Sequence, residues 1–287
     1  MGDSMLHVNH ITKYLGSFRI HDISFDLPAG YIMGLIGPNG AGKSTILQMI
    51  MGLYQTEFGN ILVAGNDVIQ NEHEVKNDIG YVLAEDLFLE NLTLLENADM
   101  YGKYYERYDR KIFLSYCRRF ELKETKKLGK HSKGEKLKFQ FAFALSHDPK
   151  LLLLDEPNAS FDPEFRKDFL KIITEFVADE KHSVVLATHL TKDLDRVADY
   201  ITFINHGELV FSLDREQMEE AYRIISGEEY KINLIPKERI VYKEKGKYGA
   251  KALIKHNKAM QYDKEVSVER PSIEDVMYYM VKGEKVC

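Results

Sequence analysis

A nine-residue run, GPNGAGKST at 37–45, contains the residue types that bind phosphate. It fits the pattern G-x-x-x-x-G-K-[ST], in which glycines let the backbone curl so that successive N–H groups point inward. The apolar stretch YIMGLIG precedes the run and predicts a buried strand, and TILQMIMGLY continues as a helix. The start of that helix adds the positive end of its dipole. The sequence therefore predicts a phosphate-binding loop between a strand and a helix.

The side chains of this loop have distinct expected contacts. Lys43 is expected to reach the β- and γ-phosphates of a nucleotide, and the Ser44 hydroxyl to bind Mg²⁺. A glycine-rich turn that binds nothing is disfavoured, because the whole pattern has the expected strand and helix on either side. The predicted nucleotide-binding residues are Gly37, Pro38, Asn39, Gly40, Ala41, Gly42, Lys43, Ser44 and Thr45.

Two carboxylates end another apolar stretch, LLLLDEP at 151–157. Asp155 is expected to hold Mg²⁺, directly or through water. Glu156 is suited to act as a general base that polarises a water for in-line attack on the γ-phosphate. The alternative is that both are solvated carboxylates at the end of a strand.

His189 ends a further apolar stretch, HSVVLATH. In open α/β sheets, ligands bind at the carboxyl edge of such strands. A neutral imidazole there would hydrogen-bond the γ-phosphate or the attacking water. The alternative is an ordinary surface or core histidine.

Strand-like and helix-like stretches alternate over the first two thirds of the chain. This alternation predicts an α/β domain with a central, largely parallel sheet, whose buried strands are continuous apolar runs. After the strand that leads into the phosphate loop, the further strand candidates are 60–65, 78–83, 150–156, 182–189, 200–205 and 208–213.

Two regions depart from this alternation. Residues 86–148 are helix-like and predict an inserted helical subdomain. After about residue 220, short half-exposed strands precede a capped helix, PSIEDVMYYMVKG. We therefore predict a domain at 1–220 and a small accessory region at 221–287.

Composition limits the class of protein. The net charge of −6 argues against nucleic acid as a partner, because binding phosphates needs clustered Lys and Arg. The two cysteines, Cys117 and Cys287, favour a reducing compartment over a disulfide framework. No run approaches the roughly 18 apolar residues of a membrane span. These features predict a cytoplasmic protein.

The motifs occur in an order that resembles the nucleotide-binding subunit of an ABC transporter, over roughly residues 5–215. They are the phosphate loop, SKGE at 132–135, LLLLDE at 151–156, SFDP at 160–163 and His189. The chain looks most like the separate ATPase subunits of Gram-positive drug and peptide exporters. The resemblance implies a P-loop cassette with an N-terminal antiparallel β region and an inserted helical subdomain.

The resemblance implies a role for HSKGE at 131–135. In this family, a signature loop caps a helix whose N-terminus faces the γ-phosphate held by the other subunit of a head-to-tail dimer. Ser132 and the backbone of Gly134 match the groups that donate to phosphate. Lys133 and Glu135 replace the usual Gly and Gln. The alternative for Ser132 is an ordinary N-cap.

Three further residues are assigned by resemblance. Tyr14 matches the aromatic residue on which adenine stacks. Asp162 matches an aspartate that meets its counterpart across the dimer, or alternatively caps the helix beginning near Pro163. Ala84 stands where the family has a metal-contacting Gln, so that the adjacent Glu85 becomes a candidate metal ligand.

The implied function is that of an ATP-hydrolysing motor subunit, with ATP and Mg²⁺ as cofactors, which closes as a homodimer or heterodimer. It is expected at the inner face of the cell membrane, where it would energise export of peptides, drugs or other amphiphilic compounds by a separate permease. Two alternatives stay open: a soluble ABC ATPase acting on ribosomes or chromosomes, and a degenerate regulatory cassette.

Overall fold

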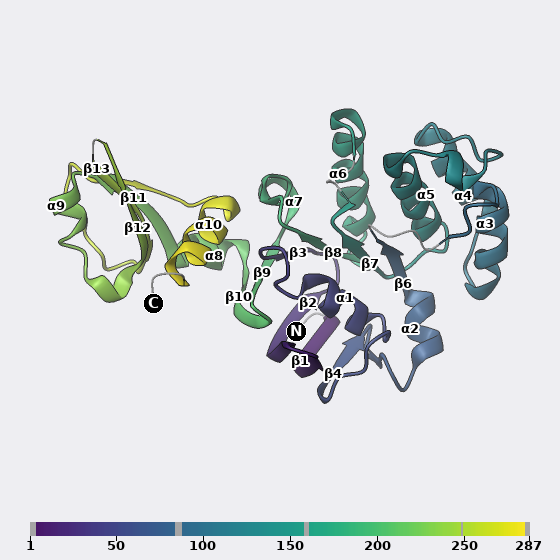
Figure 1. Cartoon of the computed structure of the whole chain (residues 1–287), viewed down its shortest axis with the longest axis horizontal. Helices are drawn as coiled ribbons and strands as arrows, with labels where there is room; N and C mark the ends of the chain where they lie inside the picture. The colour runs from purple at the N-terminus through teal and green to yellow at the C-terminus, as the bar shows by residue number, and fades with distance from the viewer. Residues whose placement is uncertain (1–3, 84–87, 158–160, 248, 285–287) are drawn as a thin grey trace.

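The computed structural model describes residues 4–83, 88–157, 161–247 and 249–284 (Figure 1). An N-terminal antiparallel sheet, a central sheet and a C-terminal antiparallel sheet follow one another along the chain. The first has the order β2-β1-β4-β5. Its strands are β1 (Ser4–Leu15), β2 (Phe18–Pro28), β4 (Phe58–Val63) and β5 (Asn66–Asp67).

The central sheet has the order β10-β9-β3-β8-β7-β6. Strand β3 pairs in parallel with β8 and β9, and β7 pairs in parallel with β6 and β8, whereas β10 runs antiparallel to β9. The predicted, mostly parallel α/β sheet is thus confirmed. Its strands are β3 (Ile32–Ile36), β6 (Ile79–Val82), β7 (Leu151–Asp155), β8 (Ser183–Thr188), β9 (Tyr200–Asn205) and β10 (Glu208–Asp214).

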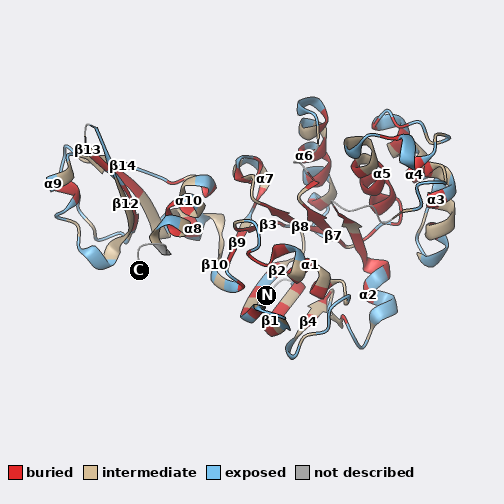
Figure 2. Cartoon of the chain, viewed as in Figure 1, coloured by how far each residue is buried: buried red, intermediate tan, exposed pale blue. Residues whose placement is uncertain are grey.

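Both faces of the central sheet are covered, as its continuous apolar strands require. Leu151 and Leu153 of β7 face the N-terminal sheet and helix α1 (Lys43–Ile50), whereas Leu152 and Leu154 face the other helices. Figure 2 shows these central strands as the buried middle of the molecule. The phosphate loop therefore directly follows a strand, β3, that is packed on both faces.

A group of helices lies at one end of the molecule (Figure 1), and we call α3, α4 and α5 the helical layer. Helix α6, between β7 and β8, packs beside it. The predicted helical subdomain, 86–148, contains the helical layer, and its boundaries stay a prediction. The helices are α2 (Glu72–Asp78), α3 (Leu94–Tyr101), η1 (Gly102–Tyr104), α4 (Arg110–Arg119), η2 (Leu128–Lys130), α5 (Lys133–Leu145) and α6 (Pro163–Val177).

Side chains fix where these helices begin. Thr93 and Ser132 each form a reciprocal capping box with a glutamate three residues later, and Asp109 and Asp162 accept N–H groups of the next turn. Such caps each stabilise a helix start by about 1 kcal/mol. The starts of α5 and α6 are thus set locally by sequence.

The C-terminal sheet has the order β12-β13-β11-β14, with α10 packed on β12 and β13. Helix α8 leads into it from β10, and η4 with α7 connects β8 to β9. The elements are η4 (Thr191–Asp193), α7 (Leu194–Val197), α8 (Arg215–Ala221), β11 (Tyr222–Gly227), α9 (Glu229–Ile232), η5 (Lys237–Arg239), β12 (Ile240–Gly246), β13 (Gly249–Lys255), β14 (Ser267–Glu269) and α10 (Ile273–Glu284).

This sheet corresponds to the predicted accessory region, 221–287, whose limits stay a prediction. Among the helices that the structure describes, none combines the length and the apolar character needed to cross a lipid bilayer.

Candidate nucleotide site

Two glycines let the predicted phosphate loop fold tightly between β3 and α1. A Cβ on Gly37 would lie 2.2 Å from the backbone oxygen of Ile204 on β9. A Cβ on Gly42 would lie 2.5 Å from Ile20 Cδ1, and its φ of +110° is a conformation that suits glycine. Gly42 also supplies no side-chain cap to α1. The first N–H groups of the helix therefore remain available to a phosphate.

The Lys43 side chain curls back over the loop and is only 6% exposed. Its ammonium group donates to the backbone oxygens of Gly37 and Pro38, at 2.9 and 3.2 Å. Burial lowers its pKa, and the nearby carboxylates of Glu156 and Asp155 partly offset that effect. This buried cation lies against the phosphate loop, where it could balance the charge of a bound phosphate.

The Glu156 carboxylate is held from three sides. The oxygen Oε1 lies 3.6 Å from Lys43 Nζ and accepts the His189 N–H at 3.1 Å, while Oε2 lies 2.9 Å from His189 Nδ1. Oε2 also accepts the Thr188 hydroxyl at 3.2 Å. The backbone of Glu156 is left-handed, with a φ of +50°, which is uncommon for a residue other than glycine.

Sheet pairing explains why these residues meet. Thr188 of β8 pairs with Ile36, the last residue of β3, and Ala187 pairs with Asp155, the last residue of β7. Parallel strands present their carboxyl ends at one edge, where ligands of open α/β sheets bind. The structure therefore brings the phosphate loop, Glu156 and His189 together, as the motifs predicted.

The predicted metal ligands supply oxygen atoms, which Mg²⁺ prefers. Asp155 is buried next to Glu156 in the sequence, and its carboxylate interacts electrostatically with Lys43. Ser44 is exposed at the start of α1. This donor set fits a magnesium ion bound with a nucleotide. Glu85, the third predicted ligand, and Ala84 lie outside the described residues.

Ser132 caps the N-terminus of α5. Its hydroxyl accepts the Glu135 N–H at 3.2 Å, and its own N–H is bound by the Glu135 carboxylate at 2.7 Å. That N–H group lowers the pKa of Glu135. Ser132 is nevertheless exposed, and Gly134 lies on the first turn. A capping hydroxyl that accepts one hydrogen bond still has its own proton to donate.

Asp162 caps α6 by accepting the Phe165 N–H at 2.8 Å. Its second oxygen accepts a hydrogen bond at 3.1 Å from Lys138 of α5, six residues after Ser132. Lys138 also lies 4.2 Å above the centre of the Phe165 ring. Helix α5 is thus linked to the start of α6 within one chain.

Tyr14 projects from β1 with 53% of its surface exposed, as a stacking platform would.

Sequence reasoning missed Thr188, although this residue directly precedes His189 at the end of a strand. It also missed an aromatic hollow of about 570 Å³ between α2, η1 and α5. The tyrosine-rich stretch MYGKYYERY was the available signal. Its aromatic walls are Phe88, Tyr101, Tyr104, Tyr105 and Phe143.

The fold, with the phosphate loop beside Glu156 and His189, is that of a P-loop nucleotide-binding cassette. The family model described as ABC transporter matches residues 20–159. A solved structure of the ATP-binding subunit of an ABC transporter superposes with a TM-score of 0.70 at 24% identity. That match covers 75% of this chain and 92% of the other. At this identity the match supports the fold alone.

Closer relatives show the family. The chain is 30% identical over 210 residues to the ABC transporter ATP-binding protein NatA of Bacillus subtilis (strain 168). The aligned region covers 71% of this chain and 85% of NatA. It is 33% identical over 204 residues to the Nod factor export ATP-binding protein I of Rhizobium leguminosarum bv. viciae, covering 69% and 65%. The chain belongs to the ATP-binding proteins of ABC transporters and is an ATPase of that family.

Proposed function

We propose that this subunit binds MgATP in the loop at 37–45 and hydrolyses it after a second cassette closes over the nucleotide. The observation that carries the proposal is the convergence of Lys43 and His189 on the Glu156 carboxylate. A general base needs a proton acceptor held within hydrogen-bond reach of the attacking water. Glu156 occupies the strand end beside the loop where that water would lie.

The ion pair between Lys43 and Glu156 gives the site a resting state. A γ-phosphate entering the loop would take Lys43 as its counter-ion, because the buried ammonium already points toward this edge. The Glu156 carboxylate would then keep Thr188 and His189 as partners and turn one oxygen toward water. A bound magnesium ion would neutralise phosphate charge, with Ser44 and Asp155 as the residues that hold it.

A second cassette would complete the site with its Ser132 hydroxyl, the Gly134 backbone and the N-terminus of α5. ATP then stabilises the closed dimer because its γ-phosphate contacts both subunits only in that state. Asp162 would lie at the same interface, and Tyr14 would stack on adenine. The second cassette would be another copy of this chain or a related chain.

The partner of the dimer is proposed to be a membrane permease, with which subunits of this family work. Its cytoplasmic segment would bind the aromatic hollow, where Tyr104 is 77% exposed. Exposed aromatic side chains are typical anchors of protein interfaces. The subunit would then lie at the inner face of the membrane.

The transport direction is proposed to be export. Nod factor export protein I is named for export and shares a third of its aligned residues with this chain. Peptides, drugs and other amphiphilic compounds are the proposed substrate class. Their recognition would belong to the permease.

Replacing Glu156 by Gln tests the catalytic assignment. Turnover, measured as phosphate release, is expected to fall by about a hundredfold or more, because the amide cannot accept the proton of water. ATP binding should be kept, and ATP-dependent association kept or increased. Glu164→Gln, which changes an exposed acid in the first turn of α6, is the matched control and should turn over normally. Unchanged turnover in Glu156→Gln would remove Glu156 from this role.

A further inference from the structure

The residues that follow His189 are held by the C-terminal part of the chain. This connecting segment (190–197) leads from β8 into η4 and α7, which have three and four residues. Helices this short do not form stably on their own, so their position depends on the elements packed against them. Leu194, the first residue of α7, is fully buried in the apolar cluster that also contains Ile273 of α10. The connecting segment therefore packs in the same core as the C-terminal helix.

Polar anchors from α10 and α8 meet at Asp195 of α7. Its Oδ1 accepts the backbone N–H of Ile273, the first residue of α10, at 3.1 Å. Its backbone oxygen accepts a hydrogen bond at 2.6 Å from Nη1 of Arg215, the first residue of α8. The dipole of a helix favours a carboxylate beside its first N–H groups, and hydrogen bonds to ionised groups are stronger than neutral ones. Asp195 thus joins two C-terminal helices to the connecting segment.

Both donors that reach Asp195 are themselves fixed. Ser272 caps α10, because its hydroxyl accepts the Asp275 N–H at 3.0 Å and Asp275 Oδ2 accepts the Ser272 N–H at 3.1 Å. Arg215 Nε donates to Glu219 Oε1, one turn further along α8, at 3.1 Å. The C-terminal helices therefore present their donors to Asp195 in a defined geometry.

At its other end, the connecting segment adjoins the nucleotide site. The His189 N–H donates to the Glu156 carboxylate at 3.1 Å, and the imidazole Nδ1 lies 2.9 Å from it. Asp193 of η4 accepts a hydrogen bond at 2.6 Å from Nε of Arg166 of α6. Asp195 comes six residues after His189. Because η4 and α7 are short, a shift of Asp195 is expected to reach His189.

We propose that the C-terminal part of the chain positions His189 for ATP hydrolysis, with Asp195 as the connecting residue. This proposal rests on the proposed function, in which Thr188 and His189 orient the Glu156 carboxylate. Asp195 is a positioning residue, because it acts through His189 and does not contact the nucleotide. The region that begins with α8 is then part of the catalytic apparatus and not an independent appendage.

Replacing Asp195 by Ala tests the connection. The variant loses the acceptor for the Ile273 N–H, so His189 should shift and kcat should fall about threefold to thirtyfold. KM for MgATP should stay within about twofold of the wild-type value, because the phosphate loop keeps its contacts. Asp195→Asn keeps an oxygen that accepts the N–H and should recover most of the lost turnover. A wild-type kcat in Asp195→Ala, with His189→Ala impaired, would overturn the proposal.

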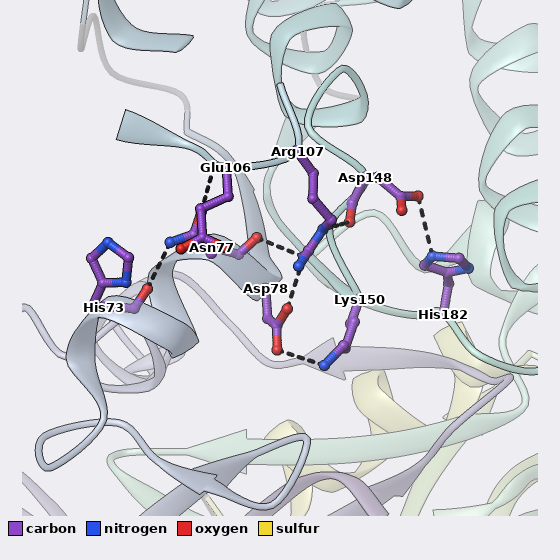
Figure 3. A network of polar contacts seen from close by, with 8 residues as sticks. All are labelled: His73, Asn77, Asp78, Glu106, Arg107, Asp148, Lys150 and His182. Carbon is purple, nitrogen blue, oxygen red and sulfur yellow. Dashed lines mark hydrogen bonds and ion pairs between the residues drawn. The ribbon is translucent and has the colours of Figure 1, made fainter. Parts of the chain in front are cut away.

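The amino end of β8 supplies a matched control. His182, directly before β8, lies 2.9 Å from Asp179 through Nδ1 and 3.5 Å from Asp148 through Nε2, and Figure 3 shows the second pair. Asp179→Ala removes a carboxylate from this end of the strand, away from His189, and should turn over like the wild type. A loss equal to that of Asp195→Ala would mean that weakening either end of β8 lowers turnover, which contradicts a specific role for Asp195.

A double substitution shows whether Asp195 acts through His189. In single-turnover measurements, Asp195→Ala should slow hydrolysis in the wild type but cause no further loss in His189→Ala, where the positioned group is absent. The same fold loss in both backgrounds would refute the proposal, because Asp195 would then act on another part of the protein.

NMR of the histidine rings reports on His189 without turnover. In protein labelled with nitrogen-15 in its imidazoles, the His189 signal is identified by its absence from His189→Ala. Without nucleotide, it should broaden or split in Asp195→Ala and match the wild type in Asp179→Ala. Asp195→Asn should shift it less, and it tests the connection even if Asp195→Ala does not fold.

The two proposals fail in different ways. An unchanged His189 signal in both Asp195 variants would exclude the connection, whatever the turnover. Normal turnover in His189→Ala would instead refute the proposed role of this histidine in hydrolysis, and the NMR comparison would still test whether Asp195 positions it.

Discussion

At the scale of single residues, the motifs predicted the chemistry but not all of its partners. The spacing of the phosphate loop predicts Lys43, and the ends of two apolar strands predict Glu156 and His189. The structure brings the three within hydrogen-bond or ion-pair distance. Thr188 and Lys138 were not expected, because their roles depend on which strand or loop folds beside them. No sequence pattern indicates that a given threonine or lysine will lie beside a particular strand or loop.

His147 is a buried group outside the nucleotide site whose charge state depends on folding. It is 1% exposed and stacks on Tyr105, with ring centres 4.0 Å apart. Burial, and then the positive charge of Arg107, lower its pKa to about 4 from an ordinary value of 6.5. The folded protein therefore keeps this imidazole neutral under conditions in which the unfolded chain protonates it.

The sign of the pH dependence follows from linkage. The stability from a neutral His147 is fully present above pH 6.5 and is lost as pH falls from there toward 4. Urea unfolding at pH 7 and pH 5 should show an acid loss about 2 kcal/mol larger in the wild type than in His147→Phe. Phenylalanine keeps the stacking and does not titrate. Equal losses of unfolding free energy in the wild type and His147→Phe would contradict a buried, neutral His147.

At the scale of elements, patterns fixed by local chemistry were predictable. The parallel strands, the helix after the phosphate loop and the start of α5 follow from apolar runs and caps. The contact between Arg107 and Asp78 joins residues 29 positions apart. Neither belongs to a motif, so only the packed helices and sheet reveal their pairing.

Ser132 serves both as a helix cap and, as proposed, as a phosphate donor, and substitutions can separate the two roles. Ser132→Asp keeps a good cap and places a favourable charge at the helix start, so its unfolding free energy should stay near that of the wild type. Its carboxylate would repel the γ-phosphate, so ATP turnover should fall about tenfold or more. Ser132→Thr keeps both functions and is the control. Normal turnover in Ser132→Asp would leave Ser132 as a cap only.

At the scale of the whole molecule, one face of the C-terminal sheet packs into the same core as the cassette, whereas its other face has a small apolar cluster of its own. Ile273, Val276 and Tyr279 of α10 belong to the same apolar cluster as the helical layer and one face of the central sheet. The N–H of Ile273 also donates to the Asp195 side chain at 3.1 Å. The shift in sequence pattern near residue 220 predicted a separate region but not this continuity, because shared burial is a tertiary property.

The continuous core predicts cooperative unfolding. In calorimetry of the full chain without nucleotide, the C-terminal sheet and the cassette should melt in a single transition. Ile273→Ala, which trims the shared cluster, should lower the melting temperature of that one transition and cost about 2–5 kcal/mol. Two resolved transitions, with Ile273→Ala moving only one of them, would show instead that the regions fold independently.

The central claim is that the loop around Lys43 grips the phosphates of MgATP, and its most direct test is isothermal titration of the purified subunit with MgATP. Binding is expected in the micromolar to millimolar range. Lys43→Ala should weaken it by at least about tenfold, because the buried counter-charge is lost. Absence of binding, or equal affinity in Lys43→Ala, would contradict the account.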